Sequence, residues 1–137
     1  MRQVPLVLIA ALCLTAAPVV AEESRPSEGN PVPQAVSSDP TYGYTEGNPI
    51  KVGRQRGGPS AEEAYLRSIA GPAGEPVKYK RLGSCCEFET PNGLAGLGGL
   101  LDVYEVKYRG IEKPVNLYLN MYDYEQPLAP IGFSVAQ

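Results

Sequence analysis

Two adjacent cysteines, Cys85 and Cys86, are the side chains whose spacing most directly suggests chemistry in this 137-residue sequence. Neighbouring Cα atoms lie about 3.8 Å apart, whereas a relaxed disulfide spans about 4.4 to 6.8 Å, so bonding the pair would close a distorted and easily reduced ring. Three states stay open: free thiols with one packed in the core, a vicinal disulfide, or disulfides to another chain. A metal site is not expected, because the sequence has no His to complete a ligand set.

A basic, glycine-rich segment is a second candidate site, for binding an anion. Lys51, Arg54 and Arg56 precede two glycines at the start of a predicted helix. Backbone N–H groups at a helix start and guanidinium groups can together hold a phosphate or a sulfate. The spacing does not match the phosphate-loop motif G-x-x-x-x-G-K-[ST], so a solvated basic loop is the alternative.

The polar face of residues 115–122 is a third candidate, for binding a partner. Apolar residues alternate strictly there with Asn116, Tyr118, Asn120 and Tyr122. Tyrosine gives contact area at a low entropic cost and asparagine adapts its hydrogen bonds, so we expect this face to contact an envelope protein or a glycan. The absence of Trp weakens the glycan option. The alternative is a sheet face that the rest of the chain covers.

Three carboxylates, Asp102, Asp123 and Glu125, flank the last two predicted strands. An antiparallel pairing would bring Asp102 towards Asp123, and paired carboxylates can divide into an acid and a base. The alternative is that they are charged residues at strand ends. Because the absence of His removes the Ser-His-Asp and Cys-His mechanisms, we lean towards a non-catalytic protein without a cofactor.

A helix is predicted to begin at Gly58 or Ser60 and to end before Gly71. Ser60 and Glu63 fit a capping box, and Pro59 suits a first turn. An isolated helix of this length is marginal in water, so it must pack on another element. The side chains predicted to do so form an apolar stripe of Tyr65, Leu66, Ile69 and Ala70.

Three segments have the composition or the period of strands: residues 77–82, 101–108 and 115–122. The last two are predicted to form a hairpin, and the glycine-rich residues 91–99 a long loop. We therefore predict an α+β fold in which one short helix packs on a three- to four-stranded antiparallel sheet.

The N-terminal part of the chain is predicted to lie outside the fold. The apolar run at residues 6–17, followed by small residues, predicts a signal peptide over residues 1–21; a membrane span needs about 20 apolar residues. Residues 22–40 contain four prolines and no aromatic residue, which is typical of a disordered spacer. Residues 41–137 then form a single small domain. We expect export to the periplasm or the outside, with no transmembrane segment after cleavage.

The charge balance excludes one class of partner. The chain has 12 Lys and Arg against 15 Asp and Glu, a formal net charge of −3. A nucleic-acid partner would require a basic face, so none is expected. The oligomeric state does not follow from the sequence.

Several segments resemble a set of small exported bacterial proteins: residues 48–53, 58–72, 81–88 with its Gly-Ser-Cys-Cys run, 100–104, and 117–123, which reads Leu-Tyr-Leu-Asn-Met-Tyr-Asp. Members often carry the label 2-dehydro-3-deoxyphosphooctonate aldolase. The enzyme of that name is similar to cytoplasmic barrel aldolases, and such barrels need roughly 250 residues. The resemblance implies export, and it carries no catalytic residue over to this chain.

Three hypotheses follow, in this order. The first is a non-catalytic exported binding domain. The second is a thiol redox or disulfide-linked protein that uses Cys85 and Cys86. The third is the sugar-phosphate enzyme that the resemblance implies, for which the basic loop would bind the phosphate.

Overall fold

The computed structural model describes residues 31–53 and 58–137. The predicted signal peptide, the first part of the predicted spacer, and Arg54 and Arg56 lie outside these residues. The elements are β1 (Ile50–Lys51), α1 (Gly58–Ser68), β2 (Ile69–Ala70), β3 (Lys78–Phe88), the 3-10 helix η1 (Leu94–Gly96), β4 (Gly99–Lys107), β5 (Val115–Asn120) and β6 (Ser134–Val135).

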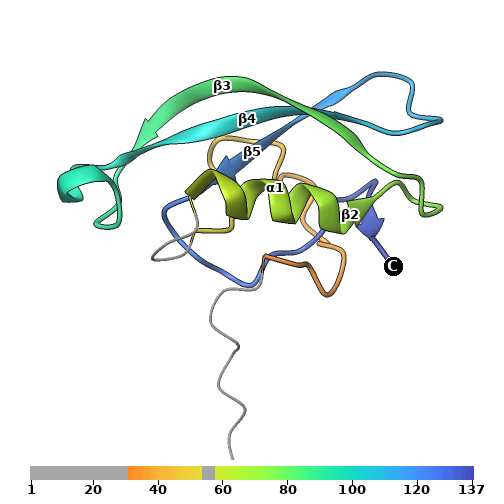
Figure 1. Ribbon diagram of the computed structural model, residues 1–137, viewed down its shortest axis with the longest axis horizontal. Coiled ribbons are helices and arrows are strands. Elements are labelled where there is room, and N and C mark those ends of the chain that lie inside the picture. Colours follow the sequence, from red (N-terminus) through yellow and green to blue (C-terminus); the bar gives the residue numbers. More distant parts are fainter. Residues whose placement is uncertain (1–30, 54–57) are drawn as a thin grey trace, which may run out of the picture.

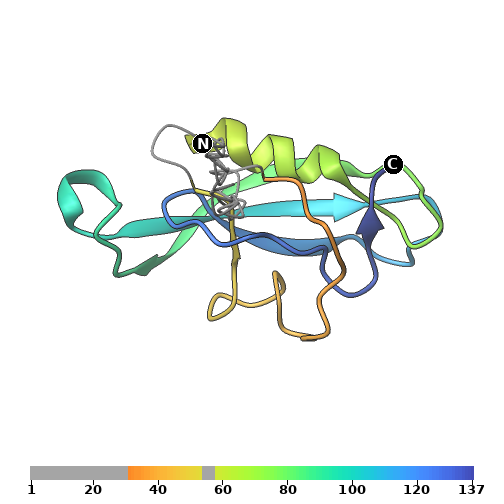
Figure 2. The ribbon, with the colours of Figure 1, turned by 90° about the horizontal axis from the view of Figure 1, so that it is seen from below.

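One helix packs on a four-stranded sheet with the strand order β1-β5-β4-β3 (Figure 1). Strands β2 and β6 form a separate two-stranded sheet beside the end of α1. This arrangement confirms the predicted α+β class with a single helix on a sheet. Figure 2, seen from below, shows α1 lying lengthwise against the sheet.

The four-stranded sheet is mixed, so the prediction of an antiparallel sheet was wrong in this detail. β4 pairs antiparallel with β3 and with β5, but β1 pairs parallel with β5, matching Ile50 with Leu119 and Lys51 with Asn120. Sequential strands joined by a short connection pair antiparallel, whereas a parallel pair requires a longer crossover. β1 reaches β5 from a distant part of the chain, so no turn sets its direction.

The helix ends at Ser68, before the predicted end. Ile69 and Ala70, which we placed on the helical stripe, form β2 and pair antiparallel with Val135 and Ser134. Both residues are buried, as the stripe predicted. Two apolar residues at the end of a pattern fit either a helix or a strand, so the sequence predicted their burial but not their conformation.

The core lies between α1 and the sheet. Tyr65 and Leu66 of α1 are fully buried, and so are Leu117 and Leu119 of β5, which confirms the apolar face predicted from the alternation in that strand. The Tyr65 hydroxyl donates a hydrogen bond to the carbonyl oxygen of Leu128 at 2.7 Å. The buried hydrophobic cluster consists of Ile50, Val52, Ala61, Tyr65, Leu66, Ile69, Tyr104, Val106, Leu117, Leu119, Ala129 and Phe133.

The folded chain begins earlier than residue 41, which corrects the disordered spacer for residues 31–40. Val36 forms a parallel bridge with Ala129, the N–H of Ser37 donates to the Ala129 carbonyl at 2.8 Å, and the Ala129 N–H donates to the Ala35 carbonyl at 2.9 Å. Backbone groups pair whatever side chains they carry, so a composition poor in apolar residues did not reveal this contact. None of the helices in the described part of the chain is long and apolar enough to cross a membrane.

Candidate functional site

The hairpin of β3 and β4 carries most of the candidate residues. β3 lies at the edge of the sheet and pairs along its length with β4. The connection between them, residues 89–98, contains η1 and extends beyond the end of α1 at one side of the molecule (Figure 1). We call residues 89–98 the tip.

Cys85 and Cys86 form a vicinal disulfide on β3, with Cα atoms 3.7 Å apart. Cys85 lies opposite Leu101 and Glu87 opposite Leu100, so Cys86 is the extra residue of a β-bulge. The φ angle of Cys86 is +59°, in the left-handed region that residues other than glycine seldom adopt. Both cysteines are partly exposed. The ring therefore lies at a backbone irregularity next to the tip, where a small reagent can reach it.

An ion pair holds β3 to β4 just before the ring. The Arg81 guanidinium donates to both carboxylate oxygens of Asp102 at 2.8 Å, and the Ser84 hydroxyl donates to Oδ1 at 2.7 Å. Burial raises the pKa of Asp102, but the hydrogen bonds from Arg81 and Ser84 outweigh it and keep the pKa below its ordinary value. Asp102 is 1% exposed and is ionised at neutral pH. This cluster fixes the pairing of β3 with β4 at Ser84.

Glu62 of α1 approaches the same carboxylate from the helix side. It is fully buried, and burial, followed by the charge of Asp102, raises its pKa from an ordinary 4.5 to about 8. The Tyr104 hydroxyl donates to Oε2 at 3.0 Å, while no donor among the described residues reaches Oε1. A proton on Glu62 explains both the raised pKa and the lack of a donor to Oε1, because a neutral carboxyl can itself donate a hydrogen bond to Asp102. The two acids form a neutral and ionised pair that links the helix to the hairpin.

This pair lacks the access that a catalytic site requires. The exposed fractions of Glu62, Asp102 and Tyr104 are 0, 1 and 3%. A general acid must lie within hydrogen-bond reach of the substrate, and these oxygens face one another inside the protein. The sequence patterns did not single out Glu62, although it lies three residues before Tyr65, in line with the predicted apolar stripe. A carboxylate in that position was the available signal.

The remaining candidate carboxylates have separate partners. Asp123 accepts hydrogen bonds from Thr90 at 2.6 Å, Asn92 at 2.8 Å and Asn120 at 3.0 Å. Burial raises its pKa, but these hydrogen bonds prevail and leave the pKa below its ordinary value. Asp123 therefore ties the base of the tip to the end of β5. Asp102 and Asp123 therefore belong to two separate clusters, and not to the paired carboxylate site that we expected.

The four residues predicted as a partner surface do not form one exposed face. Asn116 is exposed and Tyr118 partly buried, both on β5. Asn120 is 2% exposed, and its Oδ1 accepts the N–H groups of Tyr122 and Asp123 at 2.8 and 3.0 Å. The Tyr122 ring packs edge-on against Phe88, with centroids 6.0 Å apart. The alternation ends with β5, because Asn120 closes a turn there.

Of the three residues predicted to bind an anion, only Lys51 is described by the structure. Its Nζ lies 3.2 Å from Oε2 of Glu125, the third candidate carboxylate, in an exposed ion pair. The geometry of the described chain therefore assembles no anion site around Lys51. The other two residues, Arg54 and Arg56, lie in the undescribed segment 54–57.

The tip presents large apolar side chains to solvent. Leu94 is 84% exposed and Leu97 is 85% exposed. The segment from Glu87 to Leu101 contains no Lys or Arg, and both Glu87, beside the tip, and Glu89, its first residue, are exposed. The sequence predicts only a glycine-rich loop for this segment. The two leucines inside it are the sequence signal for an exposed apolar surface, and contiguous exposed apolar patches mark interaction sites.

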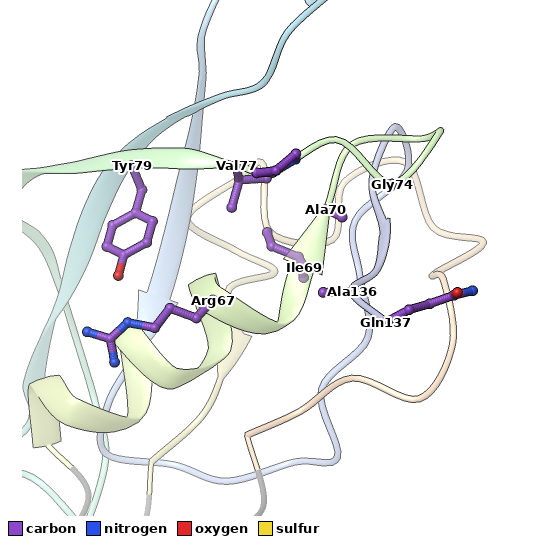
Figure 3. Close-up of a pocket in the computed structure, with 9 residues that line it drawn as sticks. Arg67, Ile69, Ala70, Gly74, Val77, Tyr79, Ala136 and Gln137 are labelled. Atoms are coloured by element: carbon purple, nitrogen blue, oxygen red, sulfur yellow. The ribbon is translucent and has the colours of Figure 1, made fainter.

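A shallow pocket of about 310 Å³ lies at the end of α1 away from the tip (Figure 3). Arg67 and Tyr79 lie at one side of it, and most of the remaining lining is apolar. The pocket lacks the convergent polar groups that mark a small-molecule site. Its lining residues are Arg67, Ile69, Ala70, Gly74, Pro76, Val77, Tyr79, Ala136 and Gln137.

Within residues 31–53 and 58–137, no group of three Cys, Asp or Glu side chains is placed to hold a metal ion. A scan against models of protein families and searches of curated proteins and of solved structures found no match to the chain.

Proposed function

We propose that this protein is an exported, non-catalytic domain that binds another protein of the cell envelope through the tip of the β3–β4 hairpin. The exposure of Leu94 and Leu97, at 84% and 85%, supports this proposal most directly. Burying a leucine side chain contributes about 1.5–3 kcal/mol, so two exposed leucines three residues apart can supply the centre of a contact.

The charges around the tip favour a protein partner. Glu87 beside the tip and Glu89 at its start are exposed, and the sequence has no Lys or Arg from residue 87 to residue 101. An anionic lipid surface or a nucleic acid would be repelled there. An apolar pocket bordered by Lys or Arg on a partner protein matches both the leucines and the acidic border.

Contacts within the chain hold the tip in an ordered conformation in the absence of a partner. Thr90 and Asn92 bond to Asp123, and Phe88 packs on Tyr122 at a centroid distance of 6.0 Å. A surface that is already ordered loses less conformational entropy on binding. These contacts therefore favour the use of the tip as a recognition element.

Photo-crosslinking in an exporting bacterial host tests the proposal. A photoreactive residue at Leu97 is expected to give a discrete adduct with a second protein, and Leu94→Ser is expected to abolish it. The same residue at exposed Lys113, in the β4–β5 turn, serves as the matched control and should give no such adduct. Absence of an adduct from Leu94, Leu97 and Leu100 contradicts the proposal. An adduct of twice the chain mass contradicts it as well, because the partner would then be a second copy.

A second candidate function is thiol–disulfide exchange at Cys85 and Cys86. The closed ring and its partial exposure favour it. Exposure to a small dithiol followed by alkylation is expected to add two alkyl groups to the folded protein. A folded protein that remains unalkylated would rule out this function.

A further inference from the structure

We infer that the Cys85–Cys86 disulfide is a redox modification site that controls the tip. Opening the ring with a dithiol releases residues 87–98, while residues 78–84 keep their pairing with β4. The consequence for partner binding rests on the proposed function, whereas the structural release does not.

The exchange reaction is balanced by a dithiol donor, either a small molecule or a protein with two neighbouring thiols. One donor thiolate attacks a sulfur of the ring, the Cys85–Cys86 bond breaks, and a mixed disulfide forms. The second donor thiol then attacks the donor's own sulfur in the mixed disulfide. This step releases the second cysteine as a thiol and leaves the donor oxidised to a disulfide. Cys85 and Cys86 thereby gain two electrons and two protons in total and become two thiols.

The chain before the ring is fixed independently of the disulfide. Arg81 and Ser84 both bond to Asp102 at 2.7 to 2.8 Å, and Asp102 is 1% exposed. Ser84 also lies directly opposite Asp102 in the strand pairing. Because these contacts end one residue before Cys85, opening the ring leaves the pairing up to Ser84 in place.

The chain after the ring depends on the bulge. Cys86 is its extra residue, with φ +59°, a left-handed conformation that is unfavourable for a residue with a Cβ. Once the covalent link is broken, Cys86 is free to return to an extended conformation. A shift of one residue in a strand turns its side chains to the opposite face, so Glu87 and Phe88 would change sides.

A movement of Phe88 would change the position of the tip through two contacts. Phe88 packs on Tyr122, and only Glu89 separates it from Thr90, which bonds to Asp123. If Phe88 turns away from Tyr122, Thr90 cannot keep its 2.6 Å hydrogen bond to Asp123 without compensating rearrangement. The disulfide and the hydrogen bonds to Asp123 thus both hold the tip in place, and reducing the disulfide weakens those hydrogen bonds.

Amide hydrogen exchange of the mature protein, with and without dithiothreitol, tests the release. Reduction is expected to accelerate exchange in residues 87–98 about tenfold or more and to leave residues 78–84 within about twofold. The NMR contacts between the Phe88 and Tyr122 rings should disappear. A Cys85→Ser/Cys86→Ser variant should match the reduced protein and show no further response to dithiothreitol, which controls for other effects of the reagent.

Two results would overturn the inference. One is unchanged exchange in residues 87–98 with the Phe88–Tyr122 contact intact after reduction. The other is loss of protection along residues 78–84 as well, which would mean that the disulfide supports the whole hairpin. Crosslinking from Leu97 separates this inference from the proposed function. A released tip without an adduct in either redox state supports the inference and contradicts the function. An adduct unaffected by reduction contradicts control of binding.

Discussion

The carboxyl groups of Glu62 on α1 and Asp102 on β4 form a hydrogen-bonded pair in which one acid is neutral and the other ionised. Burial, followed by the Asp102 charge, raises the pKa of Glu62 to about 8, while Arg81 and Ser84 stabilise the charge of Asp102. The pair joins α1, the one α-helix among the described residues, to the hairpin that carries the ring and the tip. Its protonation therefore affects the stability of the assembly that presents the proposed contact surface.

Stability is expected to decrease between about pH 5 and pH 8. The pKa of Glu62 is about 8 in the folded protein and near 4.5 in the unfolded chain, so the native state holds the proton that the unfolded chain loses in this interval. The contribution is fully present below pH 4.5 and is lost as the pH rises to 8, by on the order of 3–5 kcal/mol. Urea unfolding at pH 5 and pH 8 measures this. Equal or greater stability at pH 8 would contradict it.

Glu62→Gln is expected to remove most of this pH dependence. The amide can accept from Tyr104 and donate to Asp102, as the protonated acid does, but it does not titrate. The variant should match the wild type at pH 5 within about 1 kcal/mol and exceed it at pH 8. Glu63→Gln is the matched control, because Glu63 is exposed and pairs with Arg67 in an i,i+4 ion pair. If Glu63→Gln reduced the pH dependence of stability as much as Glu62→Gln does, a group other than Glu62 would be responsible for that dependence.

Part of this architecture could be predicted from the sequence, because local periodicity determines it. The alternation in residues 115–122 predicted the burial of Leu117 and Leu119 on β5, though not that of Asn120, and the stripe on residues 58–70 predicted which face of α1 packs on the sheet. The parallel pairing of β1 could not be predicted, since a strand of two residues has no period. The pairing of Glu62 with Asp102 depends on two residues 40 positions apart, and no local pattern relates them.

Asp102→Asn is expected to destabilise the protein by about 3 kcal/mol at pH 7. The substitution removes the charge that Arg81 and Ser84 bind in a buried position, and breaking such a pair leaves its partners uncompensated. Lys51→Ala breaks the exposed pair with Glu125 and should change stability by less than about 1 kcal/mol. Urea unfolding of both variants gives the comparison. Similar losses for the two would show that the buried cluster is no stronger than a surface ion pair.

Leu94→Ser/Leu97→Ser is expected to leave the folding stability within about 0.5 kcal/mol of the wild type. These side chains are 84% and 85% exposed and therefore make few packing contacts to lose. Leu117→Ala, in the core, should instead cost about 2–5 kcal/mol, because Leu117 is fully buried against the helix. Thermal and urea unfolding distinguish the two cases. If the tip variant loses as much stability as the core variant, the two leucines pack within the protein, and the apolar surface on which the proposed binding depends does not exist. If its stability is unchanged, folding does not require these two side chains, and the apolar surface they form is available for the proposed contact.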